Sequence, residues 1–443
     1  MNTPIYDFVQ NYIKSNTARL HMPGHKGVSF LGCEQSDITE IKGADELYAP
    51  TGIIRESEEN ATRLFGTAKT VYSAGGSSQS INAMLYLAYL RADKTRKPYV
   101  LAGRNAHKSF IYALAKLDAD VKWLYPEISG SICSCIVTAG MLEKRINELD
   151  YKPFAVYITS PDYLGGMSDI ENISQVCKKY DIPLLVDNAH GSYLKFYKRD
   201  LHPISLCADM CCDSAHKTLP VLTGGGYLHI AKDDKYGFSQ NVINAMAIFG
   251  STSPSYLILQ SLDLCNKYID EKIRKDIKKC AENVAELRCL INSKGFDIVS
   301  AEPLKLTVDF RGRNLDFKCI LRENRIEFEY ADDDFVVFMF TPQNSQEDFC
   351  KLKKVFDSIG DIGKSDYQNV EFPESEQVMT IRQAVFCENE EIDVDKALNK
   401  ICASPTVSCP PAIPIAVSGE RITEKHIELF KKYKIEKILV IKQ

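Results

Sequence analysis

The chain has 443 residues, of which 45% are hydrophobic and 26% are charged, and its net charge is -5. This balance is typical of a globular protein, and the length permits two or three domains. A mildly acidic chain without a basic stripe is a poor match for nucleic acid, so we expect no nucleic-acid partner.

The apolar and cysteine patterns narrow the class further. No stretch reaches the ~18 apolar residues of a membrane helix, and the amino-terminal run does not resemble a signal peptide. We therefore expect a cytoplasmic protein without a membrane partner, whose 15 cysteines stay reduced. Cys207, Cys211 and Cys212 are not followed by a second pair at zinc-ligand spacing, so we expect no metal.

Short apolar runs alternate with helical patterns from about residue 71 to residue 230. The predicted strands are 99–102, 121–125, 155–159, 184–187, 210–213 and 226–230. The predicted helices are 78–91, 107–117, 141–149 and 170–180. This alternation predicts an α/β fold with a mainly parallel sheet covered by helices on both faces. Ligands of such sheets bind at the carboxyl ends of the strands.

The pattern changes near residues 251–255. One long helix is predicted over 256–294, strands and one helix over 303–342, a polar connection over 365–372, and a last helix and strand before residue 443. We predict four parts: an N-terminal segment (1–35), a large cofactor-binding domain (36–265), a small α/β domain (266–365) and a C-terminal domain (366–443).

Two strand ends carry groups suited to an anion and to a ring. Gly76, Ser77 and Ser78 precede a helix, where glycine allows close backbone approach and helix N–H groups and hydroxyls bind anions. His107 opens the helix after the strand 99–102. Taken singly, the first pattern is more typical of a capped glycine turn, and His107 of a helix cap or a surface residue.

Two other strand ends carry an acid and an amine. A buried carboxylate at Asp187 needs a positive partner such as a protonated pyridine nitrogen, and the small Ala189 leaves room for a flat ring. Lys217 lies beside Ser214 and His216, and a partly desolvated lysine is a nucleophile suited to imine formation. Singly, Asp187 is as typical of a turn cap, and Lys217 is more typical of an exposed lysine.

The order of these four features is more specific than any one of them. A phosphate cradle, a ring-stacking histidine, an aspartate for a ring nitrogen and an imine-forming lysine follow one another along the chain. This set predicts an enzyme that binds pyridoxal 5′-phosphate (PLP) covalently through Lys217, with PLP supplying the electron sink.

At these residues the chain resembles the Orn/Lys/Arg decarboxylases of the short bacterial type, which are fold-type-I PLP enzymes. The resemblance spans nearly the whole length. Its motifs are LHMPGHK at 20–26, DITE at 37–40, DEL at 45–47, RNAHKS at 104–109, DNAHG at 187–191, SAHKTLP at 214–220, TSPS at 252–255 and PPAIP at 410–414. It implies a PLP-dependent transferase-like large domain followed by smaller α/β C-terminal domains.

The resemblance also implies the roles of individual residues. Lys217 would hold PLP, Asp187 would pair with its ring nitrogen, and His107 would stack on its ring. Further contacts to the cofactor are implied for Gly76, Ser77, Ser78, Ala189, His190, Ser214, His216 and, across a dimer interface, Thr252 and Ser253. The protein is accordingly expected to form a homodimer or a higher homo-oligomer.

The activity implied is α-decarboxylation of arginine, lysine or ornithine to the corresponding amine, in polyamine metabolism. A cationic substrate needs acids at its far end, and the candidates are Glu329, Asp332, Asp333, Asp45 and Glu46. Each of these acids is individually more typical of a solvated surface charge. The alternatives are another fold-type-I activity (an aminotransferase or a β-lyase), a catalytically weak binding or assembly homologue, and a lysine site without PLP.

Three positions depart from the pattern of the family. Gln79 stands where a small residue is expected, Asn188 follows the ring aspartate in place of an acidic or small residue, and Cys409–Ala412 replaces Tyr-Pro-Pro-Gly. These departures bear on substrate and rate more than on cofactor binding.

Overall fold

The computed structural model describes residues 1–127, 130–360, 363, 366–367, 369–405 and 412–442. These residues form two compact units, Met1–Arg91 with Pro183–Ile277 and Ala92–Ile182 with Lys278–Gln443. Cys409, Pro410 and Pro411 of the last motif lie outside the described residues. Among the described residues, no helix is both long enough and apolar enough to span a bilayer.

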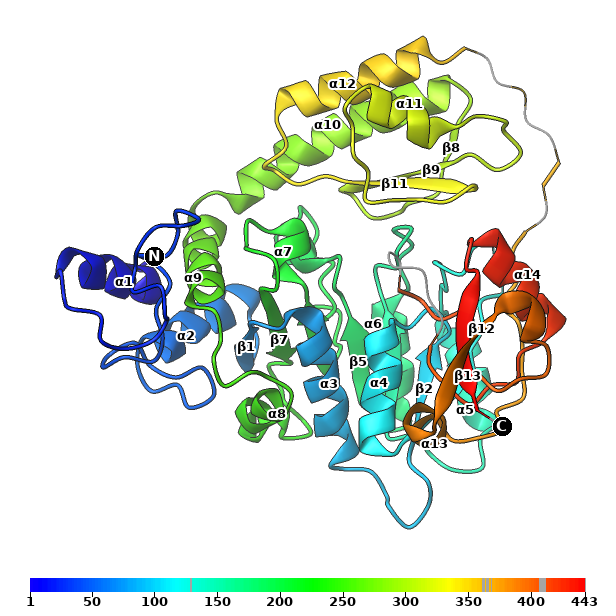
Figure 1. The fold of residues 1–443 in the computed structure, drawn as a ribbon, viewed down its shortest axis with the longest axis horizontal. Helices are drawn as coiled ribbons and strands as arrows, with labels where there is room; N and C mark the ends of the chain where they lie inside the picture. Colours follow the sequence, from blue (N-terminus) through cyan, green and yellow to red (C-terminus); the bar gives the residue numbers. More distant parts are fainter. Residues whose placement is uncertain (128–129, 361–362, 364–365, 368, 406–411, 443) are drawn as a thin grey trace. The chain divides into compact units, whose positions relative to one another are not determined.

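The main sheet has seven strands in the order β1-β7-β6-β5-β4-β2-β3 (Figure 1). The strands are β1 (Lys69–Ser73), β2 (Tyr99–Gly103), β3 (Asp120–Leu124), β4 (Ala155–Thr159), β5 (Leu184–Asp187), β6 (Met210–Asp213) and β7 (Gly226–Ile230). The predicted α/β fold with a mainly parallel sheet is confirmed. Strand β7 departs from it, because it runs antiparallel to both β1 and β6. Only the four-residue helix α7 (Ala215–Thr218) lies between β6 and β7, which is too short for a parallel crossover.

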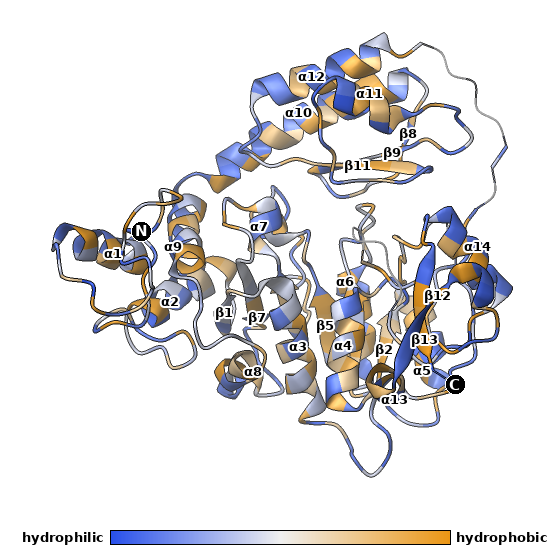
Figure 2. Cartoon of the chain, in the orientation of Figure 1, coloured by the Kyte–Doolittle hydropathy of each residue, from blue (hydrophilic) through white to orange (hydrophobic). Residues whose placement is uncertain are grey.

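Strand β5 is apolar because it is buried on both faces, as parallel strands usually are. Leu184, Leu185 and Val186 are fully buried, and Figure 2 shows β5 in the hydrophobic colour. Asp187 pairs in parallel register with Cys212 of β6. The carboxyl ends of these two strands are therefore neighbours, as the sequence predicts for a ligand site.

The helices of the first unit pack around this half of the sheet. They are α1 (Pro4–Lys14), α2 (Ile53–Phe65), α3 (Gly76–Tyr89), α7, α8 (Val242–Ile248), α9 (Tyr256–Glu271) and the start of α10 (Ile273–Ser293). The prediction of one helix over 256–294 is wrong at Lys272. That residue has φ -136°, outside the helical range, and its N–H caps α9 by donating to the Tyr268 carbonyl.

The second unit holds α4 (Lys108–Leu117), α5 (Ala139–Asn147) and α6 (Ile170–Lys179) beside β2, β3 and β4. It also holds a four-stranded sheet in the order β10-β11-β9-β8. The elements of that part are β8 (Asp297–Ile298), β9 (Lys305–Asp309), α11 (Phe317–Glu323), β10 (Tyr330–Ala331), β11 (Phe335–Met339) and α12 (Gln346–Ser358). Strands with one helix over 303–342 match the prediction for this stretch.

The last part of the second unit has its own two-stranded sheet, in which β12 pairs with β13. Its elements are α13 (Ile381–Phe386), β12 (Asn389–Asp393), α14 (Glu424–Lys432) and β13 (Lys437–Ile441). The predicted last helix and strand correspond to α14 and β13. The division into four domains at residues 35, 265 and 365 stays a prediction.

Candidate active site

Asp187 and Lys217 lie in consecutive segments that leave the sheet at the ends of β5 and β6. Asp187 is 3% exposed, and its Oδ1 accepts a hydrogen bond from the Ala189 N–H (3.1 Å). Lys217 is half-buried in α7, and its Nζ lies 2.7 Å from Nε2 of His190. A carboxylate, an imidazole and a primary amine are thus held by two short segments at neighbouring strand ends.

A cradle for an anion lies where the start of α3 meets the segment after β6. The Gly76 N–H donates to the Gly224 carbonyl (2.7 Å), and Gly76 has a φ of +66° that favours glycine. A Cβ on Gly76 would lie 3.9 Å from Cε1 of His216. A Cβ on Gly226 would lie 2.7 Å from the Asp213 carbonyl oxygen, so the backbones approach too closely there for any side chain.

The residues present fit PLP. Ser77 and Ser78 lie in the first turn of the 14-residue helix α3, whose first N–H groups have no partner within the helix. Ser214 is the N-cap residue of α7, two positions before His216. A helix start with hydroxyls suits a phosphate, the amine of Lys217 suits an aldehyde, and the buried carboxylate of Asp187 suits a protonated ring nitrogen.

Gln79 explains one departure from the family pattern. It is 5% exposed, and its Oε1 accepts hydrogen bonds from the Ser73 hydroxyl (2.9 Å) and the Gly75 N–H (3.2 Å). Its Nε2 donates to Tyr48 Oη (2.8 Å) and to the Met246 carbonyl (2.9 Å). The side chain therefore ties the start of α3 to α8 and to the Tyr48 loop.

Three predicted cofactor contacts lie apart from these groups along the chain. His107 is the N-cap residue of α4 in the second unit, and its Nδ1 accepts from the Ser109 N–H (3.1 Å). Thr252 and Ser253 lie exposed between α8 and α9 in the first unit. The roles that the resemblance gives these three residues stay predictions.

Asp45 caps helix α2. Its two carboxylate oxygens accept hydrogen bonds from the backbone N–H groups of Thr51 (2.9 Å), Gly52 (2.8 Å) and Ile54 (3.0 Å). Burial would raise the pKa of Asp45, but these N–H groups outweigh burial and lower it. Its neighbour Glu46 is exposed. A structural role thus accounts for Asp45, and substrate roles for Asp45 and Glu46 stay predictions.

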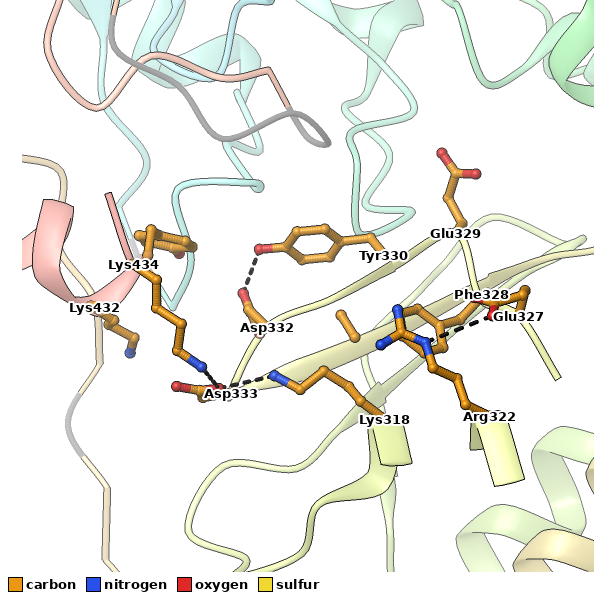
Figure 3. Close-up of a pocket in the computed structure, with 12 residues that line it drawn as sticks. Lys318, Arg322, Glu327, Phe328, Glu329, Tyr330, Asp332, Asp333, Lys432 and Lys434 are labelled. Carbon is orange, nitrogen blue, oxygen red and sulfur yellow. Dashed lines mark hydrogen bonds and ion pairs between the residues drawn. The ribbon is translucent and has the colours of Figure 1, made fainter. Parts of the chain in front are cut away.

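The small-sheet acids, Glu329, Asp332 and Asp333, lie at a cavity of about 400 Å³ in the second unit. Figure 3 shows Asp333 between two lysines, with 3.2 Å from its Oδ1 to Nζ of Lys318 and of Lys434. Burial would raise the pKa of Asp333, but the two lysines lower it. These exposed ion pairs satisfy the charge of Asp333 without a substrate.

The other two small-sheet acids bond to tyrosines. Oε1 of Glu329 accepts from the Tyr163 hydroxyl (2.8 Å), and Oδ2 of Asp332 accepts from the Tyr330 hydroxyl (2.7 Å). Burial raises the pKa of Asp332. In Figure 3, Glu329 points away from Asp333 and its lysines. The three acids therefore do not converge on one point, and their substrate role stays a prediction.

A buried cluster beside the β6 end was missed by the sequence analysis. Asp213, His202 and His229 are fully buried, and both imidazoles bond to Oδ2 of Asp213. His229 was the available signal, because it is a polar residue inside the otherwise apolar strand β7. His202, Cys211 and Asp213 also have donor atoms within 4.8 Å of one another, the one such group found among the described residues.

Comparison with known proteins identifies the family. The model of the Orn/Lys/Arg decarboxylase major domain matches residues 3–312, and the model of the C-terminal domain of the same family matches residues 364–435. The arginine decarboxylase of Bacillus subtilis (strain 168) is 28% identical over 97% of this chain and 93% of its own. Protein YaaO of the same organism has the same identity and coverage. The constitutive lysine decarboxylase of Escherichia coli is 25% identical over 57% of this chain and 38% of its own.

Solved structures show the same fold. The lysine decarboxylase LdcF of Francisella novicida superposes with a TM-score of 0.81 at 16% identity, over 99% of this chain and 81% of that one. The constitutive lysine decarboxylase of E. coli gives 0.78 at 18% identity, over 100% and 82%. An SPT structure with PLP gives 0.56 at 13% identity, over 72% and 80%. The predicted fold-type-I architecture is confirmed.

The family match covers the segments that carry the cradle, Asp187 and Lys217, and these residues fit the cofactor that the motifs predict. The chain belongs to the Orn/Lys/Arg decarboxylase family and is a PLP-dependent decarboxylase.

Proposed function

We propose that this enzyme removes the α-carboxylate of a basic amino acid, arginine, lysine or ornithine, and that its amine product feeds polyamine formation. Arginine is the first substrate to test, because the relatives of known name that match over nine-tenths of both chains are arginine decarboxylases. The observation that carries the proposal is the hydrogen bond between Lys217 and His190 next to the buried Asp187.

The cradle residues would bind the phosphate of PLP. Ser77 and Ser78 would donate from the first turn of α3, and Ser214 and His216 would donate from the α7 side. His107 would cover the ring. When bound to Lys217, PLP would supply an electron sink for the electrons released as the carboxylate leaves as CO2.

The remaining steps belong to side chains of the chain. Asp187 would keep the ring nitrogen protonated, because a buried carboxylate favours a proton on its partner. After CO2 leaves, Lys217 or His190 would return a proton to Cα of the substrate. Because Nζ of Lys217 and Nε2 of His190 lie 2.7 Å apart, a proton would pass readily between these two side chains.

A substrate panel with CO2 detection tests the proposal. PLP-loaded protein is given arginine, lysine, ornithine, norleucine and glutamate. We expect CO2 from at least one basic amino acid and none from norleucine, which lacks the terminal charge. A keto acid or ammonia in place of CO2 would instead indicate an aminotransferase or a β-lyase. PLP-bound protein without any product would indicate a binding or assembly homologue.

We also propose that the active site is shared across a homodimer interface. Thr252 and Ser253 are exposed in the single chain, and the family resemblance implies that they contact the phosphate of the PLP bound in the other subunit. Mixing Lys217→Ala with a Thr252→Ala/Ser253→Ala variant should restore part of the activity. No recovery despite subunit exchange would contradict sharing.

A further inference from the structure

Asp213 is a buried carboxylate for which the proposed mechanism has no use. It is fully buried at the end of β6, directly before Ser214. Its Oδ2 accepts from Nε2 of His202 (3.1 Å) and of His229 (3.2 Å). Its Oδ1 accepts from Nδ2 of Asn188 at 2.6 Å. Both oxygens of one carboxylate thus have partners from other segments of the first unit.

The two imidazoles stabilise the ionised form of Asp213. Burial would raise its pKa, but His202 and His229 outweigh burial and hold the pKa well below the usual range. An ionised carboxylate only accepts hydrogen bonds, so Asn188 must turn its amide nitrogen toward Asp213. The flipped amide would place two oxygens against each other. The acceptor oxygen of Asp213 therefore sets the orientation of Asn188.

Asn188 is the second residue of the turn that carries the site. Asp187 precedes it, and the Ala189 N–H that follows it donates to the Asp187 carboxylate. A Cβ at Gly191 would lie 2.0 Å from Oδ1 of Asn188, so the amide is packed tightly against the turn. His190, which contacts the amine of the site lysine, lies between them. A change in Asn188 would therefore move the ring-facing residues of the turn.

We propose that Asp213 is a positioning residue that clamps the Asp187–Gly191 turn to the Ser214–Lys217 segment through Asn188. The clamp holds the ring aspartate, His190 and the lysine in one arrangement before the cofactor arrives. It rests on the proposed roles of Asp187 and Lys217. It also gives a function to Asn188, which the sequence marked only as a departure from the family pattern.

A bound cation is the competing interpretation of the same cluster. His202, Cys211 and Asp213 are close enough to share an ion. However, burial raises the pKa of the Cys211 thiol well above its ordinary value, and Sγ lies 3.4 Å from Oδ1 of Asp213 as a donor. The hydrogen-bond network accounts for every contact at the carboxylate without an ion.

A double-mutant cycle tests the clamp. The variants are Asn188→Ala, Asp213→Ala, the double variant and the conservative Asp213→Asn, whose amide oxygen can still accept from Asn188. The readouts are the Kd for PLP, kcat, and the pH at which the visible band of bound PLP titrates. Asp263→Asn is the matched control, because Asp263 is an equally buried carboxylate that bonds to Ser57 and to the Ile5 and Tyr6 N–H groups.

Each alanine variant should weaken PLP binding about 10-fold, and the double variant should be no weaker than the worse single one, because both changes break one interaction. Asp213→Asn should recover most of the affinity, and the control should leave the titration of the visible band in place. If Asp213→Ala does not fold, Asp213→Leu, which is close to aspartate in size and accepts no hydrogen bond, takes its place in the cycle.

Three results would overturn the clamp: additive losses in PLP affinity, single variants that bind PLP and turn over like the wild type, or stoichiometric zinc in the purified protein. These results are distinct from failure of the proposed function. Wild-type protein that binds PLP but releases no CO2 from basic amino acids would contradict the proposed decarboxylase activity. The double-mutant cycle, measured as PLP affinity, would still test the proposed clamp.

Discussion

The polar groups around Lys217 and the small-sheet acids make different kinds of hydrogen bonds. In the first unit, Asp187, Asn188 and Asp213 are at most 3% exposed, and the partners of Asn188 and Asp213 come from separate segments. In the second unit, the Asp333 side chain is 56% exposed and paired with two surface lysines. Buried groups with distant partners have one available geometry, so their function can be argued from structure. An exposed acid that is paired with surface lysines is satisfied with or without a substrate.

Lys217→Ala is the change with the largest expected effect. It would remove both the amine to which the proposal assigns PLP and one of the two proposed proton donors, so kcat should fall by about 10³-fold or more, given the ~10²–10⁴-fold of general acid–base catalysis alone. Borohydride reduction and peptide mapping of the wild type should place the label on Lys217. A label on another lysine would show that Lys217 does not hold PLP, and the residues around Lys217 would no longer be the candidate site.

Asp187→Ala should rank second. Losing a positioned charge at the reacting group typically costs ~10²–10³ in kcat, and PLP should still bind through Lys217. Steady-state kinetics with a measured PLP content checks this. A variant that keeps most of its kcat would show that burial at a strand end does not by itself mark a reacting group.

The small-sheet acids provide the direct test of the second region. Glu329→Gln should lower kcat/KM for the best basic substrate about 100-fold if its charge pairs with the substrate, since breaking a buried pair costs ~3–5 kcal/mol. Asp333→Asn should change it less than about 5-fold, because exposed pairs contribute ~0–1 kcal/mol. Asp332→Asn completes the series. Three unaffected variants would mean that another acid reads the substrate, and Asp45 and Glu46 would be tested next.

Gln79→Leu should have a smaller effect on the first region. It leaves the Gly75 N–H and the Ser73 hydroxyl with only their other acceptors, Ser73 Oγ and the Gly76 carbonyl, and it removes the Nε2 donor of the Met246 carbonyl. We expect this to cost ~1–3 kcal/mol. We expect about 10-fold weaker PLP binding, measured by titration of apo-protein. Gln260→Leu is the control, because Gln260 is equally buried and donates to the Ser36 carbonyl away from the cradle. Equal losses in both variants would contradict a cradle-specific role.

The smallest expected effect concerns stability and pH. Burial raises the pKa of Glu58 to about 8, and this carboxyl accepts from the Tyr72 N–H. A raised folded-state pKa means that the stability contributed by its proton is full below the unfolded pKa near 4.5 and is lost as pH rises through 8. The wild type should therefore lose about 1.4 kcal/mol per pH unit relative to Glu58→Gln across that window.

Thermal unfolding of wild type and Glu58→Gln between pH 5.5 and 8.5 measures the difference. Asp333→Asn is the control variant, because the Asp333 carboxyl has a lowered pKa where that of Glu58 is raised. Since the pKa of Asp333 is lowered, its contribution is lost only as pH falls through the folded-state value, and its Tm difference should stay flat in this window. A flat difference for Glu58→Gln as well would show that Glu58 is ionised in the folded protein.

Sequence periodicity predicted strands β2 to β7 but not β1. Strands β4 to β7 have the bounds predicted for them, because buried strands are mostly apolar runs. Periodicity did not show the break at Lys272, since both sides of it keep helical spacing. It also did not show the reversal of β7, which depends on the length of the connection and not on the strand itself.

The sequence pointed to site residues only within short motifs, and the roles of these residues stay predictions. Asp187, His190 and Lys217 lie in motifs, and the structure brings His190 and Lys217 into contact. The Asp213 cluster was missed because His202 and His229 are 27 positions apart and meet only through the sheet. Gln79 and Asn188 drew notice as departures, but their partners cannot be read from neighbouring residues.

The antiparallel pairing of β1 with β7 has a consequence for synthesis of the protein. Lys69 pairs with Ile230, and Gly76 bonds to Gly224, so the two halves of the cradle come from distant parts of the chain. Such long-range pairing costs loop-closure entropy before its contacts stabilise the fold. A nascent chain on the ribosome that has not yet emerged past β7 cannot form the proposed cofactor cradle. PLP that binds there as proposed would stabilise only chains that have completed this closure, so the yield of folded enzyme would rise with the concentration of PLP.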